Sequence, residues 1–585
     1  MRLVIGLICF WVSTIGYLVL LNKKTKLPYE LLLPLWFTIN GIIMFFAGIL
    51  NILKLASILL CISGIVIFIY HLVKKKIKFK ELITTNTIIF LVVILYLTLV
   101  TKNMHLLHYD NFSHWGLIIK TMFIKDALPN FEDTIIMFKD YQPGSAVFIY
   151  YIGLLLGKTE SSMILGQNYL IASYFFSLLI FTKNLKKDKI KSILSKLIIL
   201  AGYLFILIGN IKFNDLLVDT LLSVMLIYSF VLMYYFKDDL KKAFIYILPV
   251  SVYMFLVKNT GIVFVGFNCL GLLYLGIINK KFKKSFIYAM IVGISSLVVF
   301  YIWSRHVTYV YGTTALSSKH SLSAQNIIGE LRAKGKTRIF EFIKLYFNHF
   351  FEISKNIGNM YMIGINATLV SIMIAFKKKW KSLLKLICGV DLIYIMYWGI
   401  LGLMYLLSMP WNEASNLSSF DRYMMTIVIS IIGLSLIAII DLVKDEKSKS
   451  KIIIVSILII TIIISVNIKY NFNKSNELIG DQDYEKTTAY TYDKTLHKQM
   501  FIAKEGDYYY IYAPKTSLND AGYLHFLSRY KLNTLNYKVV DSMDDFSKDI
   551  DEKYNEKIIV FDKEKQIKDY IKDNNYIKKD KIYTK

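Results

Sequence analysis

The sequence predicts an all-α polytopic membrane protein with about 14 transmembrane helices and a small C-terminal α/β extracytoplasmic domain. Three observations lead to this fold class. First, 55% of the 585 residues are hydrophobic and only 19% are charged, a balance unusual for a soluble domain. Second, the apolar residues gather in runs long enough to cross a hydrocarbon layer of about 30 Å, which takes roughly 20 helical residues. Third, the end of the chain loses these runs and becomes polar.

Twelve clear apolar runs follow one another along the chain, and each is predicted to be a membrane-spanning helix. The first run follows Met1 and Arg2 directly and lacks a small-residue cleavage site, so we expect a retained helix and not a removed signal peptide. All four cysteines lie inside runs and are interpreted as small core residues. The runs cover residues 3–21, 31–53, 56–73, 88–100, 197–211, 216–236, 262–278, 286–303, 360–376, 386–409, 424–443 and 452–468.

Lysine clusters between the runs set the predicted orientation, because cytoplasmic loops of membrane proteins carry an excess of lysine and arginine. Consecutive cytoplasmic clusters must be separated by an even number of crossings. Between two clusters, residues 85–182 hold runs at 88–100 and 163–181 and a shorter run at 144–156. We therefore expect 144–156 to be a re-entrant or interfacial helix. The same clusters account for the net charge of +27, so no nucleic-acid partner is expected. They lie at 23–26, 74–80, 183–191, 237–242, 280–284, 377–381 and 444–451.

This orientation places the chemically distinctive residues on the outer side of the membrane. Residues 1–468 are predicted to form the polytopic part, with a catalytic outer loop at 102–142 and a second outer loop at 305–359 that holds an amphipathic surface helix. Residues 469–585 are predicted to form the extracytoplasmic domain. Its expected strands lie at 508–512, 534–540 and 557–561, and its expected helices at 521–530, 546–554 and 563–573.

The first outer loop carries the densest group of reactive side chains, in residues 108–116 (HYDNFSHWG). Its acid, Asp110, lies at the membrane surface between aromatic residues. A carboxylate in that position can act as general base and take a proton from an acceptor hydroxyl. The alternative is a belt of aromatic residues at headgroup level, with Asp110 as an ordinary exposed acid. Composition alone supports the two interpretations about equally.

The order of features in this region resembles the bacterial GT-C membrane glycosyltransferases of the polyprenyl-phosphate-sugar-dependent, family 39-like type. A span is followed by an outer loop with an early acid, an amphipathic stretch, and residues 140–144 (DYQPG), which open a short helix. The resemblance covers residues 86–470 as an architecture. It implies a polyprenyl-phosphate-linked sugar donor, a glycan or lipid-linked acceptor, and a catalytic acid in the first large outer loop, which matches Asp110.

The same resemblance leaves a metal cofactor open. Many members carry two acids in this loop motif, whereas Asn111 follows Asp110 here. Asp110 and Asn111 are therefore the candidate ligands of a divalent cation, Mg²⁺ or Mn²⁺, with His114 as a further neighbour.

Polar residues at the outer ends of later spans are further candidates. Arg422 follows Phe420 and Asp421, and the resemblance implies that such an arginine grips the phosphate of the lipid donor; the alternative is a helix cap with a snorkelling arginine. Lys258 is the lone charge of an outward turn, and either meets a lipid phosphate or is solvated. Asp215 and Asp219 are expected on one helix face, facing an acceptor or a metal, or marking a helix start. The candidate substrate-binding residues are His114, Lys120, Asp140, Tyr141, Asp219, Lys258, Asp421 and Arg422.

These residues, taken with the resemblance, imply an inverting glycosyltransferase of the hexosyltransferase type that acts on the outer face of a bacterial plasma membrane. Asp110 is the predicted base, and Arg422 with Lys258 is predicted to stabilise charge on the departing lipid phosphate. The sequence holds no nucleotide-binding motif, which suits a lipid donor. Two alternatives remain. An envelope polysaccharide polymerase or ligase would use polyprenyl diphosphate and would need more arginines in outer loops. A polytopic lipid or solute transporter would carry charges in mid-span and an inverted repeat.

Overall fold

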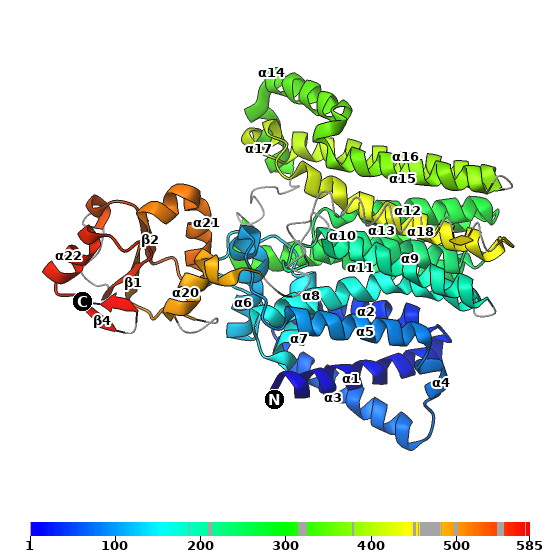
Figure 1. Cartoon of the computed structure of the whole chain (residues 1–585), viewed down its shortest axis with the longest axis horizontal. Helices are drawn as coiled ribbons and strands as arrows, with labels where there is room; N and C mark the ends of the chain where they lie inside the picture. The colour runs from blue at the N-terminus through cyan, green and yellow to red at the C-terminus, as the bar shows by residue number, and fades with distance from the viewer. Residues whose placement is uncertain are drawn as a thin grey trace.

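Long apolar helices lie side by side and make up most of the computed structural model (Figure 1). The structure describes residues 2–185, 188–208, 213–313, 324–376, 379–448, 452–453, 456, 480, 482–496, 501–546, 555–579 and 581–584. Within these residues, 11 helices are long and apolar enough to cross a membrane, and three shorter apolar helices lie among them. The chain is thus a multi-pass membrane protein of the predicted all-α class. The predicted span 452–468 falls almost entirely outside the described residues.

The first half of the bundle is built around a buried central helix. Its helix α8 begins with a capping box between Thr159 and Ser162, which satisfies free backbone groups of the first turn. Every residue of α8 except Ser161 is buried by protein, whereas α3 leaves most of its apolar side chains uncovered, as lipid-facing helices do. The elements are α1 (Arg2–Thr25), α2 (Tyr29–Ile49), α3 (Leu53–Val73), α4 (Phe79–Leu82), α5 (Thr85–Thr101), η1 (Asn111–Trp115), α6 (Gly116–Lys125), α7 (Gly144–Leu156), α8 (Glu160–Phe175), η2 (Phe176–Leu185) and α9 (Lys189–Ile208).

The second half packs its own buried helix against the first. Helix α10 is buried along nearly its whole length and contacts α8, α11 and α18. A helix that is apolar all round belongs in an interior, so α8 and α10 together form the core. The elements are α10 (Asp219–Tyr235), α11 (Leu240–Val257), α12 (Gly261–Ile278), α13 (Phe282–Tyr311), α14 (Ala324–Phe351), η4 (Ile353–Lys355), α15 (Ile357–Ala375), α16 (Trp380–Leu407), α17 (Trp411–Ser415) and α18 (Phe420–Asp445).

Helix α7 is the short apolar segment for which we expected no full crossing. Its 13 residues give a length of about 20 Å at 1.5 Å per residue, which is less than the thickness of a hydrocarbon core. It is almost completely buried and packs against α1, α2 and α8. These dimensions agree with a re-entrant helix, and its depth in the bilayer stays a prediction.

The segment expected to be the second outer loop is largely helical. Helix α13 continues to Tyr311, and α14 follows from Ala324, with an interruption at Gly335, whose φ of 61° lies in the left-handed region. Large apolar side chains such as Phe340 and Phe347 are exposed on α14, as expected of an amphipathic surface helix. Residues 314–323 of the predicted loop lie outside the described residues.

The C-terminal part forms the predicted small α/β unit. Its five-stranded sheet has the order β2-β1-β3-β5-β4, in which β1 pairs in parallel with β2 and β3 while β5 runs antiparallel to β3 and β4. The expected helix 546–554 retains only Phe546, at the end of a single 3₁₀ turn, because 547–554 fall outside the described residues. The elements are η7 (Tyr484–Lys486), α20 (Thr488–Leu496), β1 (Asp507–Tyr512), α21 (Pro514–Leu532), β2 (Tyr537–Val540), η8 (Met543–Phe546), β3 (Asn555–Val560), α22 (Lys565–Asp573), β4 (Ile577–Lys579) and β5 (Ile582–Thr584).

The C-terminal unit docks on the end of the helix bundle where η1 and α6 lie (Figure 1). Its helix α21 carries the contact: the Tyr523 hydroxyl donates to the carbonyl of Leu107 at 3.0 Å, and the Lys120 ammonium donates to the carbonyl of Tyr530 at 2.6 Å. The first outer loop and the C-terminal unit therefore share one end of the molecule. That this end faces the outside of the cell stays a prediction.

Candidate active site

The segment that carries Asp110 is held between the helix bundle and the C-terminal unit. Asp110 immediately precedes η1, a single π-helical turn. The Asn111 side-chain carbonyl accepts a hydrogen bond from the Leu216 amide at 3.0 Å, which ties η1 to the start of α10. On the other side, the fully buried ring of Phe112 packs against Tyr523 and Tyr530 of α21. The position of the Asp110 carboxylate is therefore set by contacts on two faces.

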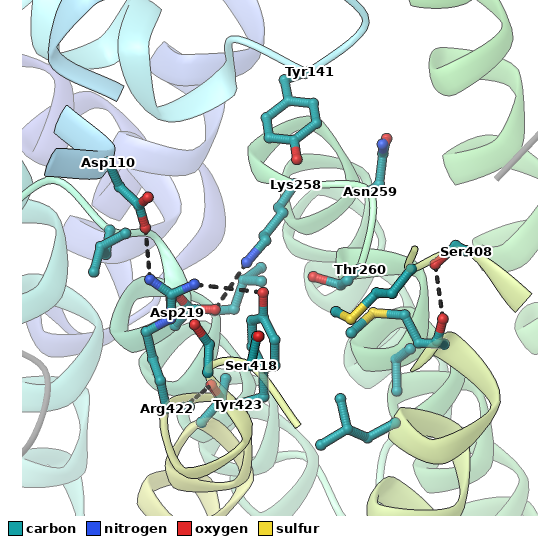
Figure 2. A pocket seen from close by; sticks show the side chains of 18 of the residues that line it. Asp110, Tyr141, Asp219, Lys258, Asn259, Thr260, Ser408, Ser418, Arg422 and Tyr423 are labelled. Carbon is teal, nitrogen blue, oxygen red and sulfur yellow. Dashed lines mark hydrogen bonds and ion pairs between the residues drawn. The ribbon is translucent and has the colours of Figure 1, made fainter. Parts of the chain in front are cut away.

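A cavity of about 580 Å³ lies beside Asp110. Four ionisable side chains from well-separated segments converge on one part of its wall (Figure 2). Asp110 comes from the loop between α5 and η1, Asp219 from the start of α10, Lys258 from the turn between α11 and α12, and Arg422 from the first turn of α18. These are the acid and three of the polar residues that the sequence singled out at different outer boundaries.

Two cations and two anions alternate in this group. The Arg422 guanidinium lies 2.7 Å from a carboxylate oxygen of Asp110 and 3.8 Å from one of Asp219. The Lys258 ammonium lies 2.9 Å from the other oxygen of Asp219. Asp219 thus bridges both cations, and its side chain is 4% exposed. Buried charges persist when they are paired, so the four groups stabilise one another and balance to zero net charge.

Tyr423 supports both cations from the next position on α18. The Lys258 ammonium and the Arg422 guanidinium each lie 5.2 Å from the centre of its ring, within the range of a cation–π interaction. The ring and the Asp219 carboxylate therefore hold two positive groups close together on one wall of the cavity.

Several polar atoms near the cavity lack a hydrogen-bond partner within the described residues. They are buried, and they include both ring nitrogens of His114, the amide nitrogen of Asn111 and Nε of Arg422. Burial lowers the pKa of His114 to about 3, so its imidazole is neutral. Buried polar groups are normally satisfied by protein, water or ligand. Their concentration here fits a ligand rich in hydrogen-bonding groups.

The rest of the cavity wall is mainly apolar. It is formed by the start of α12, the first part of α14 and the last turns of α16. A polar end with paired charges and an apolar extension match a ligand that has a charged head and a hydrocarbon chain. The apolar lining residues are Trp115, Phe138, Leu217, Leu222, Ile262, Val263, Phe264, Ile327, Ile400, Leu401, Leu403, Met404, Leu407, Met409 and Phe526.

Six of the nine residues predicted from sequence line this cavity. Besides the four charged residues, these are His114 and Tyr141, whose rings meet edge to face at 4.8 Å between centroids. The Tyr141 hydroxyl points into the cavity (Figure 2). Cavity residues that the sequence did not single out include Glu413 and Phe526. No local pattern marks them, because their position depends on packing between distant segments.

Three predicted substrate-binding residues do not line the cavity. Lys120 is fully buried, donates to the carbonyls of Tyr530 and Lys531, and has its pKa lowered to about 7 by burial. Asp140 is buried, and its backbone carbonyl accepts a hydrogen bond from the Trp303 indole at 2.8 Å. A carboxylate oxygen of Asp421 accepts from the amide of Ile357, at the start of α15, at 3.2 Å.

The expected pair Asp215 and Asp219 does not share a helix face. Asp219 is the first residue of α10, whereas Asp215 lies in the preceding turn, where its carboxylate accepts from the Leu217 amide at 2.9 Å. The turn breaks the helical spacing that the sequence suggested. Asp215 is buried outside the main cavity, and burial raises the pKa of its carboxyl to about 7.

Asp110 and Asn111, the candidate metal ligands, already have partners in the structure, and a metal at this position stays a prediction. The Asn111 oxygen already accepts from the Leu216 amide, and the Arg422 guanidinium occupies Asp110. A second group of ligand-type residues, His105, Glu160 and Asp493, lies at the junction with the C-terminal unit. There the Lys531 ammonium lies 2.9 Å from Glu160 and 2.8 Å from Asp493, so this lysine already supplies the positive charge that a metal would bring.

Comparisons with known proteins give one similarity. No family model matches the sequence, and no curated protein matches it. Among solved structures, the chain is similar to ArnT from Cupriavidus metallidurans, whose crystal structure was determined bound to undecaprenyl phosphate. The similarity covers 85% of this chain and 97% of that chain, with 10% sequence identity and a TM-score of 0.37. At this level of similarity, the function has to be argued from the residues of this chain.

Proposed function

We propose that this protein is a membrane glycosyltransferase of the GT-C type. It transfers a sugar from a polyprenyl-phosphate donor to a cell-envelope glycan or a lipid-linked acceptor on the outer face of the membrane. The observation that carries the proposal is the cavity in which Asp110, Arg422 and Lys258 meet at one end of an apolar chamber. A carboxylate base, two cations and an apolar wall are the groups that transfer from a phosphate-linked lipid requires.

The two cations suit the phosphate of the donor. A guanidinium presents donors in a plane that matches phosphate oxygens, and an ammonium adds a compact positive charge. In the structure both cations are neutralised by acids, Arg422 by Asp110 and Lys258 by Asp219. An arriving phosphate would compete with Asp110 for Arg422, and this exchange would leave the Asp110 carboxylate facing the acceptor. The isoprenoid chain would then extend along the apolar wall formed by α12 and α16.

The proposed reaction is one in-line displacement with inversion at the anomeric carbon. The Asp110 carboxylate takes the proton of the acceptor hydroxyl while that oxygen forms the new bond to the anomeric carbon. The bond from this carbon to the phosphate oxygen breaks, and its electron pair leaves with the polyprenyl phosphate. Arg422 and Lys258 stabilise the charge that develops on this leaving group. His114 and Tyr141 are positioned to bind sugar hydroxyls. No step is assigned to a metal.

The test measures the rate at which the full-length protein, in nanodiscs, transfers sugar from a radiolabelled polyprenyl-phosphate donor to an acceptor. Asp110→Asn keeps the size of the side chain but removes the base, and is expected to lower transfer by about 10²- to 10⁴-fold. Asp133→Asn is the matched control, because Asp133 lies in the same loop and pairs with Lys125 at 2.9 Å outside the cavity. Full activity of the Asp110→Asn variant would contradict the proposed mechanism.

The same assay separates the proposal from its alternatives through the lipid product. A glycosyltransferase of this type releases polyprenyl phosphate, whereas a polymerase or ligase releases polyprenyl diphosphate. A transporter would move the lipid or a solute across the membrane without breaking the glycosidic bond. Release of diphosphate, or movement without cleavage, would replace the proposed function.

A further inference from the structure

The backbone just before Asp110 is held residue by residue, and mainly by the C-terminal part of the chain. Gln482 accepts from the amide of His105 at 2.8 Å and donates to its carbonyl at 3.0 Å. The amide of Leu106 donates to Glu160 at 3.1 Å. The carbonyl of Leu107 accepts from the Tyr523 hydroxyl at 3.0 Å. Three consecutive residues of an irregular loop thus have backbone groups fixed by side chains from elsewhere.

Glu160, which holds the middle residue of the three, is itself held by the C-terminal unit. The Lys531 ammonium lies 2.9 Å from its carboxylate, and both side chains are almost completely buried. The His105 ring stacks on Tyr484 with 3.7 Å between centroids and 1° between planes. Buried ion pairs tolerate little displacement, because an unpaired charge in such a place is costly. The contact is therefore a rigid one.

The C-terminal unit also reaches the cavity itself. Phe526, on the same helix as Tyr523, is part of the cavity wall. Its ring lies 6.4 Å from that of Tyr109, another wall residue whose side chain is half exposed to solvent. This part of the wall therefore reaches the protein surface, and it is formed by other elements than the apolar wall of α12 and α16.

From these contacts we infer that the C-terminal unit completes the active site, with Gln482 and Tyr523 as positioning residues for Asp110 and Phe526 as a contact for the acceptor saccharide. The inference rests on the proposed function. A base displaced by about 1 Å can lose about 10²-fold in rate, so fixing three residues before Asp110 has a direct effect on the reaction. The donor would enter from the apolar side, which leaves the side with Phe526 to the acceptor, and aromatic rings commonly line such sites.

The positioning role is tested with two tyrosines of the C-terminal unit whose hydroxyls each donate to a backbone carbonyl. Tyr523→Phe removes the bond to Leu107, and Tyr510→Phe removes an equivalent bond, of 2.9 Å, to the carbonyl of Phe546 within the C-terminal unit. Each variant loses the bond from its hydroxyl to a backbone carbonyl, so similar small changes in melting temperature are expected. Of these two variants, Tyr523→Phe alone should lower kcat, by about 10-fold, with KM for the donor unchanged. Gln482→Ala should behave in the same way.

The acceptor contact is tested by Phe526→Leu, which keeps an apolar side chain but removes the ring. It should raise KM for the acceptor by about 5-fold, corresponding to about 1 kcal/mol, and leave KM for the donor unchanged. Phe526→Tyr, which keeps the ring, should restore acceptor binding. A rise in donor KM would contradict the assignment of Phe526 to the acceptor.

These outcomes separate the inference from the proposed function. If Asp110→Asn is inactive while Tyr523→Phe and Gln482→Ala keep the kcat of the unaltered protein, the proposed function stands and the positioning role is wrong. If Asp110→Asn is fully active, the proposed function itself is wrong. If Tyr510→Phe lowers kcat as much as Tyr523→Phe, the effect comes from general weakening of the C-terminal unit, and the inference is overturned.

Discussion

The Arg422 guanidinium lies 2.7 Å from the Asp110 carboxylate, although 312 residues separate them in the chain. One residue comes from an irregular loop and the other from the first turn of α18. Asp219 contacts the same guanidinium from α10. The charge balance of the cavity thus depends on one arginine shared by two acids.

Replacing Arg422 is expected to affect binding of the donor and the chemical step together. Arg422→Gln removes the charge that would meet the phosphate, so we expect kcat to fall by about 10²- to 10³-fold and KM for the donor to rise. Arg422→Lys keeps the charge but loses the planar set of donors, and should retain an intermediate activity. Steady-state kinetics in nanodiscs measures both. Unchanged kcat and KM in Arg422→Gln would remove this residue from the site.

Lys258 is expected to contribute mainly through its charge. Lys258→Met keeps the length of the side chain and should raise KM for the donor by about 10-fold, the loss of one charge-assisted hydrogen bond. Lys158→Met is the matched control, because Lys158 also pairs with an aspartate, Asp126 at 2.5 Å, outside the cavity. The control should keep the donor KM of the unaltered protein. Equal effects of the two variants would mean that Lys258 acts only on stability.

Lys531 is expected to be required for docking of the C-terminal unit. Lys531→Met leaves the buried Glu160 without its closest cation, a change that costs about 3–5 kcal/mol. The melting temperature should fall by several degrees, and hydrogen exchange at residues 105–107 should rise. Adding Glu160→Gln should recover part of the loss, because it removes the unpaired charge. Lys515→Met is the control, because it removes an ion pair made by an exposed lysine. It should change neither the melting temperature nor the hydrogen exchange. No rise in exchange in Lys531→Met would contradict this role.

Asp215 is expected to make stability depend on pH. Burial raises the pKa of its carboxyl to about 7, above the value of about 4 in an unfolded chain. Between pH 4 and 7 the folded protein therefore holds a proton that the unfolded chain has released, so this group's contribution to stability falls as pH rises and levels off above pH 7. Asp215→Asn has no proton to lose. Its melting temperature should exceed that of the unaltered protein by more at pH 8 than at pH 5. An equal difference at both pH values would contradict the shifted pKa.

The elements with local sequence signals were predicted well. Apolar runs correspond to helices because a bilayer requires about 20 apolar residues in succession, and strands 508–512 and 557–561 appear within two residues of β1 and β3. Arg422 and Lys258 were singled out because a charge at the predicted outer end of a span is unusual enough to see in one sequence, and for Arg422 the resemblance added support.

Long-range contacts carried no such signal. Lys120 was expected to bind substrate because it lies close to Asp110 in the loop sequence. It is instead fully buried in α6, where it contacts the C-terminal end of α21. Phe526 was not identified at all, although it lines the cavity. Both positions result from docking of the C-terminal unit, which brings together residues about 400 positions apart.

The sequence by itself determined the membrane class of the protein, the approximate limits of its helices and the existence of a separate α/β unit, since each follows from hydrophobicity over a short window. Only the tertiary structure decided that Asp110, Asp219, Lys258 and Arg422 surround one cavity and that α21 holds the backbone before Asp110. The physical reason is that ion pairs and hydrogen bonds between distant segments depend on where the folded chain brings its side chains, and this distance has no counterpart in residue order.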